Sequence, residues 1–164
     1  MNTVWVLVCD AARARLFDVH EDGTPWHLIE RFEHEASRSR ASELVGDHSG
    51  RGSPQGGSVH HNALAPASSP KEVEEGHFAH ELATMLDQAL RSKRFRRWVL
   101  VAPPRFLGML RGEITHELAK HLVTTVDKDL SRLAVHELAV HLRDAVRVPP
   151  EQRDILREPT RHPH

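Results

Sequence analysis

The fold is decided first by the stretch Thr3–Cys9, which reads Thr-Val-Trp-Val-Leu-Val-Cys. A continuous apolar run that is rich in β-branched residues is typical of a central strand buried on both faces of a sheet. Two further strand-like segments follow, Arg13–His20 and Trp26–His34, and the pair Asp22 and Gly23 between them is typical of a hairpin turn. The three segments predict an antiparallel β-meander.

The second half of the chain alternates helical and strand-like patterns. From about Glu75, apolar residues recur with the spacing of one helix face. Trp98–Ala102 is a short apolar strand that ends at two prolines, and Leu122–Val126 is β-branched enough to be a last strand. The helical stripe predicted between these two strands consists of Leu107, Leu110, Ile114 and Leu118.

A last helix is expected after these strands, with Ser131 as its capping residue. Its expected buried face consists of Val135, Leu138, Ala139, Leu142 and Val146. The element order βββαβαβα predicts a single α/β domain over residues 1–148, in which helices cover a mixed sheet, and a polar tail over 149–164. This order is that of ribonuclease H-like folds and of the middle domain of peptide release factors, an analogy that carries no function by itself.

A long segment that is poor in apolar residues, Ser37–Glu75, separates the two halves. It is rich in Gly, Ser, His and Pro and has no sustained hydrophobic period, so we expect a flexible inserted loop. Loops of this length are uncommon in compact domains unless they are functional or disordered. We therefore place the contact with a partner on this loop, at Arg51, Gln55, Gly56, Gly57, His60 and His61.

Composition narrows the classes of function. The 22 basic and 23 acidic residues nearly cancel, so binding to nucleic acid or to an anionic membrane would need a local basic patch. A basic run that could contact the phosphates of RNA or of a ribosome consists of Arg91, Lys93, Arg94, Arg96 and Arg97. The single cysteine, Cys9, excludes an intrachain disulfide and is expected in the core. No segment reads as a signal peptide or reaches membrane-spanning length, so we expect a cytoplasmic protein without membrane insertion.

The stretch Trp98–Arg111 reads Trp-Val-Leu-Val-Ala-Pro-Pro-Arg-Phe-Leu-Gly-Met-Leu-Arg. It resembles the signature of the bacterial host attachment protein family, which has an apolar strand, Ala-Pro-Pro-Arg and Leu-Gly-x-Leu-Arg. Asp127–Ser131 and Glu137–Leu142 are similar to that family's Lys-Asp-Leu-Thr segment and closing helix, and Trp5–Val8 with Ala14–Phe17 fits its opening strands. The resemblance implies a small bacterial protein required for attachment to host cells, and it suggests kinship with release-factor-like domains.

These observations together favour a non-enzymatic binding protein that acts through a protein, ribosome or RNA partner inside the cell and needs no cofactor. A translation factor is one alternative, because the equivalent loop of release factors carries Gly-Gly-Gln. Here Gln55 precedes Gly56 and Gly57, so the residue types are the same but their order differs.

A metal-dependent nuclease is another alternative. Two-metal nucleases cluster carboxylates around the scissile phosphate. Asp10, at the end of the first strand, could be joined by Glu81 and by Asp127 or Asp129, although the strand that ends at Ala102 supplies no aspartate. The competing interpretation of Asp10 is a turn residue that accepts hydrogen bonds from nearby amides.

Overall fold

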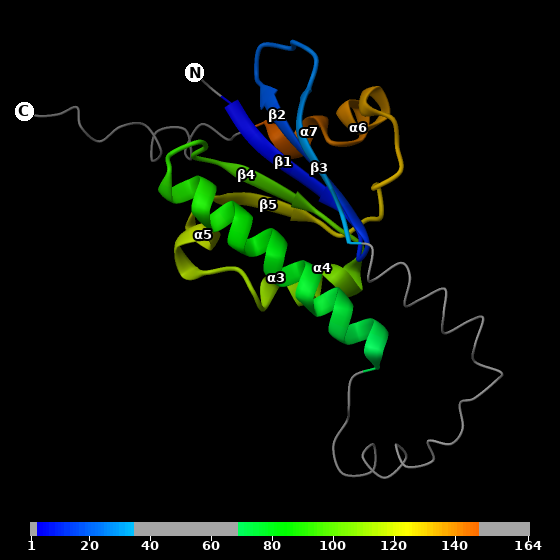
Figure 1. Ribbon diagram of the computed structural model, residues 1–164. Helices are drawn as coiled ribbons and strands as arrows, with labels where there is room; N and C mark the ends of the chain where they lie inside the picture. Colours follow the sequence, from blue (N-terminus) through cyan, green and yellow to red (C-terminus); the bar gives the residue numbers. More distant parts are fainter. Residues whose placement is uncertain (1–2, 35–68, 148–164) are drawn as a thin grey trace, which may run out of the picture.

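The computed structural model describes residues 3–34 and 69–147. These residues contain a five-stranded mixed sheet with the strand order β3-β2-β1-β4-β5 (Figure 1). Its strands are β1 (Thr3–Cys9), β2 (Arg13–His20), β3 (His27–Glu33), β4 (Trp98–Val101) and β5 (Leu122–Val126). The prediction of an α/β fold with a mixed sheet is therefore confirmed.

The strand β1 lies in the middle of the sheet. It pairs antiparallel with β2 and parallel with β4, so that Trp5 is opposite Asp18 on one side and Trp98 on the other. The outer pairs are antiparallel between β2 and β3 and parallel between β4 and β5. The predicted meander is confirmed, and the parts of the chain on both sides of the long polar segment form one sheet.

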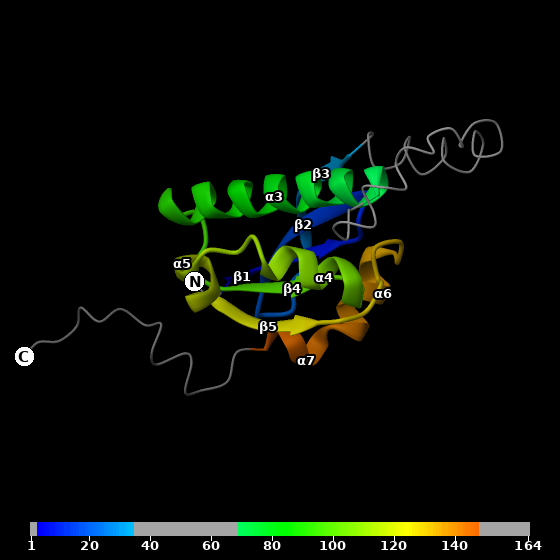
Figure 2. The same cartoon turned by 90° about the horizontal axis from the view of Figure 1, so that it is seen from below.

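Helices cover both faces of this sheet (Figure 2). They are α3 (Pro70–Arg91), α4 (Pro104–Arg111), α5 (His116–Lys120), α6 (Val135–His141) and α7 (Arg143–Val146). Successive side chains of a strand point to opposite faces. Leu7 and Cys9 therefore pack with α3, α4 and α5, whereas the residues Val6 and Val8 pack with Leu138 from the side of α6.

The helix α3 begins earlier than the sequence pattern indicated. We had placed the residues up to Glu75 in the flexible loop, and for Pro70–Glu75 this was wrong. The Ser69 hydroxyl accepts a hydrogen bond from the Glu72 amide at 3.1 Å, and the Glu72 carboxylate accepts one from the Ser69 amide at 3.1 Å. This capping box, with a proline in the first turn, starts the helix. The rest of the predicted loop lies outside the described residues, and the division into residues 1–148 and 149–164 stays a prediction.

The second half differs from the pattern in two more places. The single helix expected between β4 and β5 is two helices, because α4 ends at Gly112 and Thr115 caps α5 by accepting a hydrogen bond from the Leu118 amide. Ser131 caps no helix. The residue before α6 is Ala134, whose amide donates to the Glu137 carboxylate at 3.0 Å.

The expected buried face of the last helix is only partly right. Leu138 and Leu142 are buried, but Val135 is 37 % exposed. The chain turns after α6 into the short helix α7, so one continuous apolar stripe does not form. The order of elements still fits the fold class, while the closer likeness to ribonuclease H-like or release-factor domains stays a prediction.

Candidate functional site

The carboxyl ends of β1, β4 and β5 lie along one edge of the sheet, which we call the carboxyl edge (Figure 1). In open α/β sheets, ligands bind preferentially outside this edge. The end of β3 and the start of α3 lie at the same edge, because the backbone amide of His34 donates to the carbonyl of Ala12 in the turn after β1. A ligand-binding site is therefore expected at the carboxyl edge.

Asp10 follows β1 directly and forms the centre of this edge. Its Oδ1 accepts hydrogen bonds from the amides of Ala12 at 2.8 Å and Arg13 at 2.9 Å, which confirms the turn interpretation. Its Oδ2 lies 2.8 Å from the hydroxyl of Ser131, and the same hydroxyl lies 2.9 Å from Asp129 Oδ1. A hydroxyl has one proton to donate, so the buried Ser131 can donate a hydrogen bond to only one of the two carboxylates at a time.

The four candidate metal ligands are only partly brought together. Asp10 and Asp129 share Ser131, and Asp127 is exposed in the turn after β5. Glu81 belongs to a different cluster, where its carboxylate lies 3.6 Å from Nδ1 of His34. Within residues 3–34 and 69–147, no group of three or more His, Cys, Asp or Glu side chains has an arrangement that could hold a metal ion.

His34 lies between two carboxylates of α3, and no motif in the sequence marks it. Its Nε2 lies 3.2 Å from Glu74 Oε1 and its Nδ1 lies 3.6 Å from Glu81 Oε1. Glu74 and Glu81 are seven residues apart, two turns of the same helix face. The contact with Glu74 is a hydrogen bond, whereas the Glu81 carboxylate lies beyond hydrogen-bond distance and faces the other nitrogen of the same ring.

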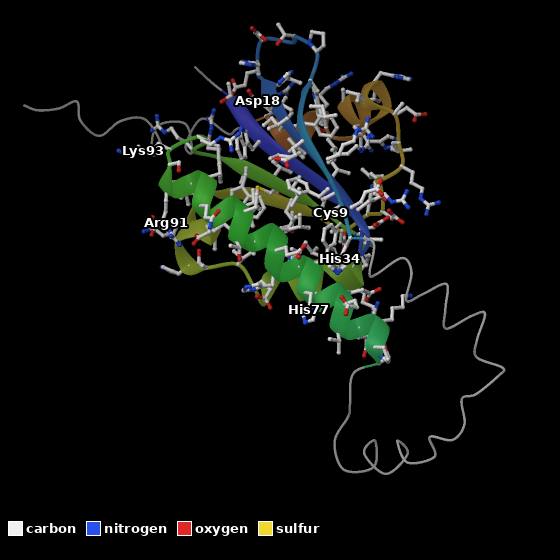
Figure 3. The ribbon with its side chains drawn as sticks, viewed as in Figure 1. Cys9, Asp18, His34, His77, Arg91 and Lys93 are labelled. Atoms are coloured by element: carbon white, nitrogen blue, oxygen red, sulfur yellow. The ribbon has the colours of Figure 1, made fainter. Side chains whose placement is uncertain are left out.

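Aromatic packing holds the His34 ring in place. The ring stacks on Phe78 with 5.2 Å between centroids, and Phe78 stacks on Phe106 of α4. The hydrogen bond with His34 lowers the pKa of Glu74, which also lies 3.5 Å from His77 Nδ1. Figure 3 shows His34 and Cys9 at the same end of the sheet, with His77 on the neighbouring helix. We call the contact of His34 with Glu74, Glu81 and Phe78 the His34 clamp.

A second long-range contact fixes the start of α3. Arg105, from the Ala-Pro-Pro-Arg stretch, donates to Glu75 Oε1 at 2.9 Å and to Glu72 Oε2 at 3.1 Å. The hydrogen bond and charge of Glu72 and Glu75 raise the pKa of Arg105. Glu75 is 2 % exposed, so this arginine compensates a buried carboxylate. Its charge therefore serves to join α4 to α3.

The basic run lies at the other end of α3, as the positions of Arg91 and Lys93 in Figure 3 show. It is not one solvent-facing patch, because Arg97 is 6 % exposed and donates to the Thr3 carbonyl at 3.1 Å. The Arg94 guanidinium lies 5.1 Å from the centroid of the Trp5 ring. Including Arg97 among surface phosphate contacts was therefore wrong, whereas Arg91, Lys93, Arg94 and Arg96 are exposed.

Phe95, around which the basic run is built, is no stacking platform for bases. It is 4 % exposed and stacks on Trp5 at 4.6 Å between centroids. A pocket of about 810 Å³ beside it is lined by cations and by the carboxylates of Asp87 and Glu117. The charge of this pocket is therefore mixed, and the basic run alone does not define a nucleic-acid interface.

The residues predicted to contact a partner lie outside the described residues. They are Arg51, Gln55, Gly56, Gly57, His60 and His61. The described residues that flank them, His34 and Ser69, belong to the carboxyl edge. Cys9, by contrast, is a buried core residue as predicted, and burial raises the pKa of its thiol.

One property of the helices and two comparisons with known proteins bear on identity. Across residues 3–34 and 69–147, every helix is too short or too polar to cross a lipid bilayer. Among curated proteins, none matches the chain significantly. The model of one protein family, described as "protein required for attachment to host cells", matches residues 5–142, which include most of β1, the other four strands and the helices from α3 to α6. The chain belongs to this family of proteins required for attachment to host cells.

Proposed function

We propose that this attachment-related protein is a non-enzymatic binding protein, which acts inside the cell by contacting a partner through residues of the segment 35–68. The observation that carries the proposal is the His34 clamp. His34 ends the first described part of the chain, and its partner Glu74 lies in the first turns of the helix that begins the second part. The two flanks of the segment are thus joined to each other and to the sheet.

A rigid base of this kind supports a binding role. Binding residues are found disproportionately on connecting segments that a rigid scaffold positions. Three contacts between distant elements stiffen the base: His34 with Glu74, Arg105 with Glu75, and the backbone bond from His34 to Ala12. Each contact fixes either His34, which precedes the segment, or α3, which follows it. This base would hold both ends of the segment in place while its residues contact a partner. Those residues are Arg51, Gln55, Gly56, Gly57, His60 and His61.

The test is capture of partners from a lysate of the source bacterium with the full chain as bait. We expect a defined set of captured proteins or ribosomal particles, and loss of that set when residues 52–61 are deleted. The variant Arg51→Ala with Gln55→Ala should weaken capture without shortening the chain. The matched control is Arg91→Ala with Lys93→Ala at the other end of α3, which should leave capture unchanged. Equal capture by the deletion variant and the full chain would contradict the proposal.

The same preparations separate this proposal from the two alternatives. Co-sedimentation with ribosomes that depends on residues 52–61 would identify the partner as the ribosome and favour a translation-linked role. Degradation of RNA or DNA in the presence of Mg²⁺ or Mn²⁺ that Asp10→Asn abolishes would instead support a nuclease. Fractionation of cells decides the location, because recovery of the protein in the outer surface fraction would contradict an intracellular role.

A further inference from the structure

Four arginines line one pocket of about 390 Å³ beside β2 and β3. They are Arg13 and Arg15 on β2, Arg31 on β3, and Arg132 in the connection between β5 and α6. We call this the arginine pocket. It lies at the carboxyl edge, because Arg13 begins the strand that follows Asp10, and Ser131 also lines the pocket. The sequence analysis did not single out any of these arginines.

The strand register brings like charges together. Arg13 and Arg15 are two residues apart on β2 and share a face of the sheet. Arg31 lies directly opposite Arg15 in the antiparallel pair, and Glu33 lies opposite Arg13. Like charges directly opposite each other destabilise a sheet. Burial, and then the charge of Arg31, lower the pKa of Arg15.

The contacts of these arginines leave much of their charge uncompensated. The Arg15 guanidinium donates to two neutral acceptors, the carbonyls of Ser131 at 2.9 Å and Leu133 at 2.8 Å. In the described part of the chain, Nε of Arg13 is buried and has no hydrogen-bond partner. The carboxylate that faces it, Asp10 Oδ2, is 4.0 Å away and already accepts from Ser131.

The balance of charge in the lining is positive. Four guanidinium groups and one carboxylate, that of Glu33, line the pocket, and outside this lining Asp10 forms an ion pair with Arg13 at 4.0 Å. Natural proteins break local rules of stability mainly at functional or strained sites. The Arg15–Arg31 pair is such a break, because an apolar or acidic residue opposite Arg15 would stabilise the same strands.

We propose that the arginine pocket binds a small ligand through a phosphate group. Guanidinium groups bind phosphate oxygens through paired, charge-assisted hydrogen bonds. A phosphate between the arginines would neutralise the like charges that Arg15 and Arg31 bring together. The volume is within the range of pockets for small ligands, and its place at the carboxyl edge is where open α/β sheets bind them. The proposal does not rest on residues 35–68.

The test measures binding of pyrophosphate to the full chain by titration calorimetry, together with the melting temperature. We expect saturable binding in low salt and a rise in melting temperature. Arg31→Gln and Arg132→Gln should each weaken binding by about tenfold or more, since each removes charge-assisted hydrogen bonds. The matched control is Lys120→Gln, which removes the same charge from an exposed side chain on α5 and should leave binding unchanged.

The melting temperature without ligand distinguishes a binding role from a structural one. Arg31→Gln removes the repulsion with Arg15, so this variant should melt at the same or a higher temperature than the wild type while losing the rise that pyrophosphate causes. A variant that melts lower and still binds pyrophosphate as the wild type does would overturn the proposal. Equal weakening by Lys120→Gln would also overturn it, because binding would then be a response to net charge.

Two further probes identify the source of the phosphate and its chemistry. Tighter binding of adenosine 5′-monophosphate or ribose 5-phosphate than of inorganic phosphate would indicate a phosphate ester, and equal binding would indicate the free ion. Both results support a phosphate site. Citrate, whose charged groups are all carboxylates, should bind at least tenfold more weakly than pyrophosphate, since a carboxylate has two oxygens in a plane and lacks the tetrahedral set of a phosphate. Equal binding of citrate, or no binding of any phosphate at millimolar concentration, would overturn the proposal.

Discussion

The two ends of α3 hold their charged side chains in different ways. At the amino end, Glu74 and Glu75 contact His34 and Arg105, which come from other elements and lie 40 and 30 residues away in the chain. At the carboxyl end, Arg91 contacts Asp87 one turn earlier on the same helix. The first end is therefore joined by charged side chains to the end of β3 and to α4. At the second end the ion pair lies within the helix, and the Thr115 hydroxyl reaches Asp87 from another part of the chain.

The difference indicates which end is suited to present a binding segment. Contacts between distant elements fix where α3 lies relative to β3 and α4, whereas a contact within one helix moves with that helix. The segment 35–68 joins the chain at the end with the distant contacts. The basic run is attached to the core mainly through Arg94 on Trp5 and the buried Arg97. We expect the two ends to respond differently to substitution.

The largest effect is expected for Arg105→Met. Removing the guanidinium leaves the buried Glu75 with Lys71, whose Nζ lies 3.8 Å away, as its remaining cation in the described part of the chain. We expect the free energy of unfolding in urea to fall by about 2–3 kcal/mol, less than for a fully buried pair because Arg105 is partly exposed. Adding Glu75→Gln should recover part of the loss. A loss that is unchanged in the double variant would show that packing of the arginine, rather than its charge, stabilises this end.

A smaller effect is expected for Ser131→Ala at the carboxyl edge. The change leaves Oδ2 of Asp10 and Oδ1 of Asp129 without the hydroxyl that now serves both. The free energy of unfolding should fall by about 1–2 kcal/mol, because a part-buried acceptor loses its donor. Ser92→Ala is the control, since Ser92 is exposed at the other end of α3. Equal losses of unfolding free energy for Ser131→Ala and Ser92→Ala would mean that side-chain contacts at the carboxyl edge stabilise the protein no more than those at the carboxyl end of α3.

The His34 clamp predicts a dependence of stability on pH. The pKa of Glu74 in the folded protein is lowered from its ordinary value of 4.5, chiefly by the hydrogen bond with His34. A lowered pKa contributes stability that is present above the unfolded value and is lost as the pH falls through the folded value. His34→Phe keeps a ring on Phe78 but removes both nitrogens, so the wild type should be the more stable at neutral pH and its advantage should shrink as the pH falls below 4.5.

Urea unfolding of wild type and His34→Phe between pH 7 and pH 3 measures this advantage. Glu74→Gln is the matched control: it also removes the Glu74–His34 hydrogen bond, so the difference in stability between Glu74→Gln and His34→Phe should stay nearly constant over this pH range. An advantage of the wild type that grows toward pH 3 would show that the carboxylate is not stabilised by this contact.

The sheet could be predicted from the sequence because its signals are local. Alternating or continuous apolar runs mark all five strands, and the segment Thr3–Cys9 carries its own evidence for a central position. The sequence also contains a signal for the start of α3. Ser69 is followed directly by a proline, and Glu72 comes three residues after Ser69. The surrounding Gly, Ser and Pro residues obscured this capping box, so the helix was expected to start too late.

The site could not be predicted in the same way because its contacts join distant residues. Nothing near His34 in the sequence indicates that its nitrogens meet two carboxylates of a helix that begins 36 residues later. Serine is a common helix-capping residue, yet the Ser131 hydroxyl lies within hydrogen-bond distance of Asp10, which directly follows the first strand. The Arg15–Arg31 pair follows from strand register, which the turn between β2 and β3 sets and which includes an irregularity after Leu16.

The smallest effect is expected for Arg91→Ala. Arg91 is 72 % exposed in its side chain and contacts Asp87 four residues earlier, an arrangement worth about 0.5 kcal/mol or less in water. Asp87 keeps the hydroxyl of Thr115, which donates to its Oδ1 at 3.0 Å, so it does not lose its last partner. Urea unfolding in low salt and in 1 M NaCl measures the change, which screening should remove. A loss as large as that of Arg105→Met would mean that the carboxyl end of α3 is tied to the sheet as firmly as the amino end, and the contrast that places the binding segment would fail.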